Sequence, residues 1–72
     1  MLERTSPRLL VWTLVKDGRS ATCHAQPHAL GVEIFWDVDQ ETQRTEVATT
    51  ALAAQALADD WRDAFNGNGW MP

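Results

Sequence analysis

Three side chains that can bind metal ions lie close together in this 72-residue sequence: Cys23, His24 and His28. Zinc requires such ligands to converge on one ion at about 2.0–2.3 Å. If this segment is a β-strand, the neighbours Cys23 and His24 point to opposite faces and cannot share an ion. The spacing therefore predicts no metal site, with Cys23 in the core and the histidines exposed.

Cys23 is also the only thiol that could act as a nucleophile. A reactive thiol needs partial exposure, a lowered pKa and a base that orients it. Beneath a helix, Cys23 would instead behave as a small, inert hydrophobic residue. We therefore predict no cysteine-based catalysis.

Five aspartates could supply paired carboxylates for acid–base chemistry or a Mg²⁺ site. They are Asp37, Asp39, Asp59, Asp60 and Asp63. Asp59 and Asp63 are four residues apart with Arg62 between them, which is typical of a solvated helix face. A Gly-Asn-Gly segment at 67–69 follows the expected helix, so it cannot hold a phosphate at a helix N-terminus. We expect no catalytic residue, no cofactor and no small-molecule substrate.

The elements that would position these residues form an α+β domain. The pattern predicts an antiparallel sheet of three to four strands, which begins with a hairpin and is covered on one face by a single C-terminal helix. The expected strands are 9–16, 20–26, 30–38 and, as a polar edge strand, 42–48. Pro27 is expected outside the ladder, because proline lacks an amide donor. Asp17-Gly18 predicts a two-residue type I′ turn. Thr49 or Thr50 is expected to cap the helix, which runs to about Phe65 and ends at Asn66-Gly67.

The two-residue turn fixes which side chains share a face, because it places Trp12 opposite Cys23. The helix side of the first hairpin is then expected to hold Leu10, Trp12, Leu14, Ala21, Cys23 and Ala25. The other face is expected to hold Val11, Thr13, Val15, Ser20, Thr22 and His24, with Phe35 beside them. The buried stripe of the helix is expected to be Ala54, Leu57, Ala58, Trp61, Ala64 and Phe65. Trp12, Trp36 and Trp61 are expected in the core, and Trp70 is expected to fold back onto the sheet.

Residues 1–8 are expected to form a flexible leader before a single domain at residues 9–70. The start of the chain has no secretory signal pattern, and its longest apolar run is far shorter than the roughly 20 residues of a membrane helix. A lone cysteine cannot form an internal disulfide. Together these observations lead us to expect a cytoplasmic protein without a membrane partner.

The net charge of −4 argues against nucleic acid as a partner, because nucleic-acid binding depends on neutralised phosphates. The charge is unevenly spread: residues 1–28 carry four basic and two acidic side chains, whereas residues 29–72 carry two basic and eight acidic ones. Lys16 and Arg19, beside the turn, are the candidate phosphate contacts. They leave weak nucleic-acid binding through the hairpin tip as the alternative function.

The chain resembles a group of short, uncharacterised bacterial proteins in its Trp12 to Arg19 hairpin, its Ala/Leu-rich C-terminal helix and its terminal Gly69-Trp70. The likeness spans most of residues 11–70 and implies no activity. A sheet followed by one helix also resembles the DNA-binding domains of plant transcription factors and phage-type integrases. Those domains insert a sheet bearing arginines into the major groove, yet the face away from the helix here is expected to present no Arg or Lys on its first three strands.

The main functional expectation is therefore a non-catalytic module that associates with itself or with another protein. A helix covers only one face of a sheet, and apolar residues on the other face are typical of an association surface. The expected interface comprises Val11, Thr13, Val15, His24 and Phe35, and a two-fold homodimer is the expected assembly. The alternative is a monomer in which residues 1–8 or the Trp70 tail cover Phe35.

Overall fold

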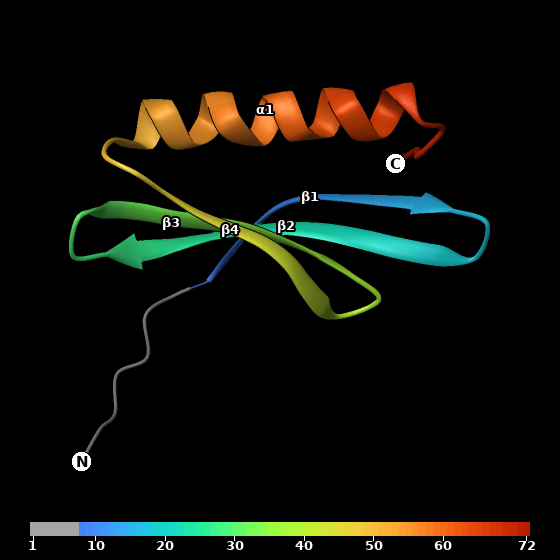
Figure 1. Cartoon of the computed structure of the whole chain (residues 1–72), viewed down its shortest axis with the longest axis horizontal. Helices are drawn as coiled ribbons and strands as arrows, with labels where there is room; N and C mark the ends of the chain where they lie inside the picture. Colours follow the sequence, from blue (N-terminus) through green and yellow to red (C-terminus); the bar gives the residue numbers. More distant parts are fainter. Residues whose placement is uncertain (1–7) are drawn as a thin grey trace, which may run out of the picture.

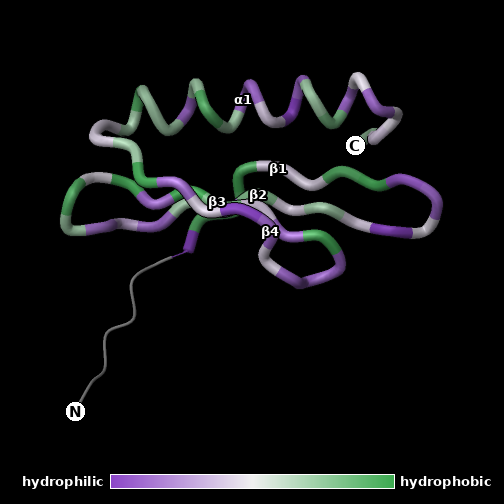
Figure 2. The backbone as a smooth tube through the Cα atoms, viewed as in Figure 1, coloured by the Kyte–Doolittle hydropathy of each residue, from purple (hydrophilic) through white to green (hydrophobic). Residues whose placement is uncertain are grey.

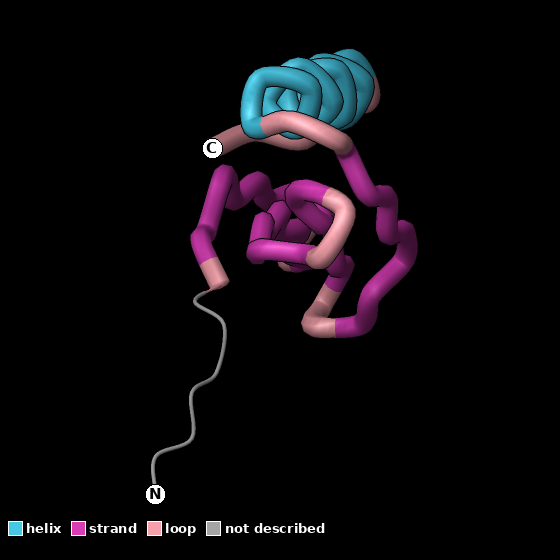
Figure 3. Tube along the Cα trace, turned by 90° about the vertical axis from the view of Figure 1, so that its left-hand side faces the viewer, coloured by secondary structure: helices cyan, strands magenta, loops and turns pink. Residues whose placement is uncertain are grey.

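The computed structural model describes residues 8–72 and has two layers, a four-stranded antiparallel sheet and one helix (Figure 1). The strands lie in the order β1 (Leu9–Lys16), β2 (Arg19–His28), β3 (Gly31–Val38) and β4 (Glu41–Ala48). Helix α1 (Ala51–Gly67) follows β4 and lies across one face of the sheet, as the end-on view in Figure 3 shows. The predicted α+β fold is confirmed. The expected leader lies outside the described residues, apart from Arg8.

The first hairpin has the predicted turn. Asp17 and Gly18 both have positive φ, 52° and 80°, as a type I′ turn requires. The register pairs Lys16 with Arg19 and Trp12 with Cys23, as expected. Figure 2 shows a hydrophilic hairpin tip directly after a hydrophobic stretch of β1.

The expected faces are wrong at the start of β1, because the strand contains a β-bulge. Leu10 pairs with His24 whereas Trp12 pairs with Cys23, so Val11 is an extra residue without a partner. Leu10 therefore shares the face of His24, away from the helix, and is 56% exposed. Val11 packs against the core on the helix side instead.

Strand β2 is longer than expected, since it includes Pro27, which pairs with Val32, and His28. β1 begins opposite Ala25, so no strand among residues 8–72 pairs with β2 on that side at Pro27, and the missing N–H interrupts no ladder of the described sheet. The second tight turn, Asp39-Gln40, also has positive φ at both residues, 52° and 71°. A second bulge lies in β4 at Gln43, because Trp36 pairs with Arg44 and Asp37 pairs with Thr42.

Helix α1 begins at the predicted cap. The Thr50 hydroxyl accepts a hydrogen bond from the Ala53 N–H at 3.0 Å. Ala64 is exposed, so it does not belong to the buried stripe. The helix also continues through Gly67, and the left-handed glycine beyond its end is Gly69, with φ of 94°. Within residues 8–72, no helix has the length and apolar character needed to cross a membrane.

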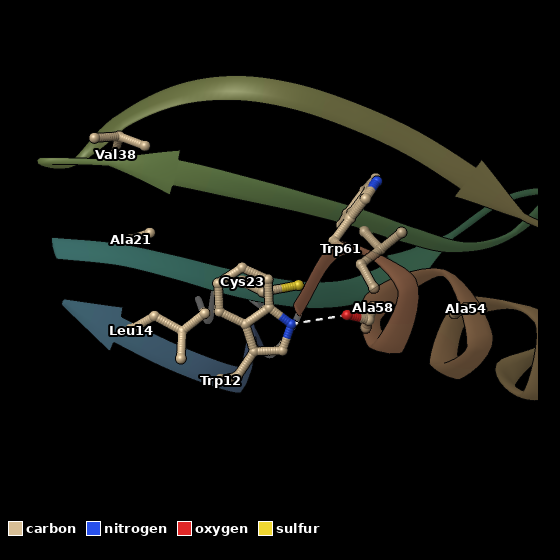
Figure 4. Packing of buried hydrophobic residues seen from close by; sticks show 9 residues of the cluster. Trp12, Leu14, Ala21, Cys23, Val38, Ala54, Ala58 and Trp61 are labelled. Carbon is tan, nitrogen blue, oxygen red and sulfur yellow. Dashed lines mark hydrogen bonds between the residues drawn. The ribbon is translucent and has the colours of Figure 1, made fainter. Parts of the chain in front are cut away.

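The core lies between α1 and the sheet (Figure 4). Trp12 is anchored there by its indole N–H, which donates to the Ala58 carbonyl at 3.0 Å. Phe65 lies within 5.3 Å, between ring centroids, of Trp12, Trp36 and Trp70. Trp70 does fold back: the next residue, Met71, exchanges two backbone hydrogen bonds with Val15 at the edge of β1.

Candidate functional site

The surface of the sheet away from α1 is the candidate site, and we call it the open face. No helix or strand of residues 8–72 covers it (Figure 3). By register, it presents Leu10, Thr13, Val15, Ser20, Thr22, His24, Gln26, Glu33, Phe35, Asp37, Thr42, Thr45 and Val47. The two bulges have added Leu10 and Val47 to this face, because each bulge shifts the register by one residue.

Phe35 occupies the centre of the open face, yet only 6% of it is exposed. The His24 ring lies beside it, with the two ring centroids 5.4 Å apart. The Arg8 guanidinium lies 5.1 Å from the centre of the Phe35 ring, within cation–π range. The Trp70 tail does not cover Phe35, because Trp70 packs on the helix side against Phe65. Phe35, one of the expected interface residues, is therefore covered by the side chains of His24 and Arg8 on the open face.

The exposed apolar residues of the open face lie on its two edge strands. Leu10 and Val15 project from β1 and are 56% and 46% exposed, and Val47 projects from β4 and is 41% exposed. Thr13, which pairs with Thr22, is also exposed. Of the five expected interface residues, the structure thus brings Thr13, Val15, His24 and Phe35 to one face and places Val11 on the other.

A histidine and a carboxylate meet within the open face. His24 Nδ1 lies 3.9 Å from Asp37 Oδ2, which is too long for a hydrogen bond, and this nitrogen is buried without a hydrogen-bond partner. Asp37 is 8% exposed and accepts a hydrogen bond from the Thr42 hydroxyl at 2.9 Å. The sequence pattern does not reveal this pair, because it depends on pairing between β2, β3 and β4.

The Cys23 thiol does not reach this His24–Asp37 pair. Cys23 is adjacent to His24 in sequence but fully buried on the helix side, as alternation along a strand requires. Burial, and secondarily the charge of Asp37, raises the pKa of the Cys23 thiol to about 12. A thiol in this state is not an activated nucleophile.

The other candidate ligands and carboxylates have local partners. His28 Nδ1 accepts a hydrogen bond from the Leu30 N–H at 3.0 Å. Asp59 accepts from Gln55 at 3.1 Å and pairs with Arg62 at 3.4 Å on the exposed side of α1. Within residues 8–72, no three His, Cys, Asp or Glu side chains are grouped so that they could hold a metal ion.

Both candidate phosphate contacts at the hairpin tip bind other groups of the same chain. Lys16 Nζ donates to the Asn68 carbonyl, beyond the end of α1. Arg19 Nε pairs with Asp39 Oδ2 at 3.1 Å. The Ser20 N–H and then this arginine hold the pKa of Asp39 below its ordinary value of 3.8. Arg19 is therefore partly neutralised by Asp39, while Lys16 keeps its positive charge but is held beside the end of α1.

A groove of about 520 Å³ lies between the first half of α1 and the end of the sheet formed by β2 and β3. Its lining is apolar except for two amides, and it comprises Leu9, Val11, Ala25, Gln26, Pro27, Gly31, Val32, Ile34, Ala51, Ala54, Gln55 and Ala58. None of these side chains can act as an acid, a base or a nucleophile. The groove exists because alanines, not larger residues, face the sheet in this half of the helix.

Comparison with known proteins adds no family to this description. No protein-family model, curated protein or solved structure matches the chain.

Proposed function

We propose that this chain is a non-catalytic interaction module that self-associates through its open face. The observation that carries the proposal is the exposure of Leu10, Val15 and Val47 on one face that no described element covers. Aliphatic side chains rimmed by polar groups are typical of association surfaces. Four of the polar residues here are threonines (Thr13, Thr22, Thr42 and Thr45), whose methyl groups also pack well.

The edges of the sheet are poorly suited to pairing with a strand of another chain, which supports association through the open face. Met71 occupies the edge of β1 at Val15, and the bulge at Val11 distorts the rest of that edge. The β4 edge is polar and carries the bulge at Gln43 beside the Arg44–Glu46 ion pair. Bulges and charges are the usual means by which proteins prevent edge-to-edge pairing.

A cytoplasmic location is part of the proposal. Cys23 is a free, buried thiol, and unpaired cysteines are typical of reducing compartments.

The experiment is sedimentation equilibrium of the wild type beside Leu10→Glu and Leu52→Glu. Leu52 lies on α1 and is 81% exposed, so it provides a matched control away from the open face. We expect the wild type and Leu52→Glu to associate with rising concentration and Leu10→Glu to remain monomeric, with melting temperatures showing that all three fold. A wild type that stays monomeric up to about 1 mM, a concentration that still reveals a millimolar dissociation constant, would refute the proposal.

Nucleic-acid binding through the hairpin tip has weaker support. Its two candidate residues are Lys16 and Arg19, and Arg19 is paired with Asp39. A gel shift at low salt tests this alternative, since electrostatic binding is strongest there.

A further inference from the structure

The charge of the sheet is divided between its two halves. In the β1–β2 half, residues 8–28 carry three basic side chains and one acidic one, a net charge of +2. In the β3–β4 half, residues 31–48 carry five acidic side chains and one basic one, a net charge of −4. Because the strands lie in sequence order, this division runs from one edge of the sheet to the other. On the open face itself it is carried by Arg8 in the first half and by Glu33 and Asp37 in the second, since Arg44 and Glu46 pair with residues of the helix side.

Two copies can place their open faces together about a two-fold axis in two simple ways. In the first, the axis is parallel to the sheet and perpendicular to the strands. Each half of the sheet then faces the same half of the partner, so the two acidic β3–β4 halves would meet. An axis parallel to the strands sets β1–β2 of each copy over β3–β4 of the other. Only the second arrangement brings opposite charges together, and either keeps the strands nearly aligned, as stacked sheets prefer.

Two charged residues of the open face lie at the same level along the strands. Arg8 directly precedes Leu9, which pairs with Ala25, so Arg8 is level with Gln26. Gln26 pairs with Glu33 and donates to its carboxylate at 2.7 Å. Rotation about an axis parallel to the strands preserves this level, so the backbone of Arg8 on β1 of one copy comes over the β3–β4 half of the other, level with Glu33. Pairing with Glu33 then requires the Arg8 guanidinium to turn away from the Phe35 ring of its own chain.

We propose that a second copy of this chain binds to the open face. The two copies are related by a two-fold axis parallel to the strands, and Arg8 of each copy pairs with Glu33 of the other. This inference rests on the proposed self-association and adds the orientation of the partner. The symmetry makes every contact occur twice, so each dimer contains two such ion pairs.

Charge reversal tests the orientation. We expect Arg8→Glu and Glu33→Arg each to weaken self-association by roughly tenfold or more, because each replaces two attractive pairs with two repulsive ones. An equimolar mixture of the two variants should form a heterodimer with wild-type affinity. The matched controls are Arg62→Glu and Asp60→Arg on α1, which change the net charge equally but lie in the other layer of the fold. Neither control should weaken the dimer. A mixture of the two controls should associate no more tightly than either one alone.

The outcomes separate the two proposals. If the wild type associates but the mixture of Arg8→Glu and Glu33→Arg does not recover, the orientation is refuted and self-association stands. If the wild type itself is monomeric, the proposed function fails together with the orientation. Melting temperatures of each variant distinguish lost association from lost folding.

Discussion

Cys23 and His24 are neighbours in the chain, yet they have opposite environments. The thiol is fully buried beneath α1, while the imidazole lies beside Phe35 on the open face. Strand alternation alone separates them, and it removes both the metal site and the cysteine–histidine dyad that their proximity in sequence suggests. The separation of the two side chains could be predicted from the sequence, since it needs only a strand and a known turn, whereas the expected exposure of His24 is wrong, because its side chain is only 19% exposed.

The state of Cys23 gives a prediction about its reactivity. With its pKa raised from 9.0 to about 12, the thiolate fraction at neutral pH falls roughly a thousandfold. Iodoacetamide should therefore modify the native protein by orders of magnitude more slowly than the protein unfolded in denaturant at the same pH. Comparable rates in both states would show that Cys23 is exposed and that the face assignment of β2 is wrong.

Asp39 gives a prediction about acid stability. Its pKa is lowered in the folded protein by the Ser20 N–H and by Arg19. Its contribution to stability is therefore full above the ordinary pKa of 3.8 and is lost as the pH falls through the lower folded value. We expect Asp39→Asn to melt below the wild type near neutral pH and the difference to vanish in acid, with Asp60→Asn as a control. A difference that does not change with pH would contradict this role.

At the scale of elements, the sequence predicted each strand and the helix but not the two bulges. Uninterrupted alternation would place Val47 opposite Val32 on the helix side, whereas the bulge at Gln43 places it opposite Glu33 on the open face. The bulge at Val11 exchanges Leu10 and Val11 in the same way. A bulge is stabilised by the twist of the whole sheet and by packing on both faces, so a local pattern contains no signal for it. The sequence therefore predicted that one face of the sheet is left uncovered, but it predicted less well which residues lie on that face.

The two hairpin turns can be compared directly by exchanging their residue types. Gln40 has φ of 71°, a conformation that costs a residue with a Cβ about 1 kcal/mol, whereas Gly18 occupies the equivalent position at no such cost. We expect Gln40→Gly to stabilise and Gly18→Ala to destabilise the protein by about 1 kcal/mol each in denaturant unfolding. A Cβ at Gly18 would meet no atom within 4 Å, so its effect reports backbone conformation alone. Equal stability of Gly18→Ala and the wild type would contradict the type I′ assignment.

The groove under α1 predicts that one core alanine tolerates enlargement. Ala54 lines the groove, so Ala54→Leu can fill empty space and should stabilise the protein by up to about 2 kcal/mol, at about 0.8 kcal/mol per buried methylene. Ala21 is fully buried and does not line the groove, so Ala21→Leu should cost about 1–3 kcal/mol through overpacking. Thermal melting of the two variants decides the point. Similar losses for both would mean that the groove does not persist in solution.

The open face is small for an interface between two proteins. Four strands of about eight residues span roughly 19 by 26 Å, or about 500 Å², at the usual strand spacing and rise. A standard interface buries about 800 Å² on each partner. We therefore expect a weak dimer whose affinity depends on the few exposed aliphatic side chains and on the charge division, and which weakens as salt is added.

The most direct test of the open face is a dilution series followed by amide NMR. Lowering the protein concentration from about 1 mM to about 10 µM should dissociate a weak dimer and shift the signals of the residues at the interface. We expect the shifts to concentrate at Leu10, Thr22 and Phe35, while Leu52 and Ala56 on the exposed side of α1 remain unchanged. Signals that do not move on dilution, or that move mainly along α1, would contradict association through the open face.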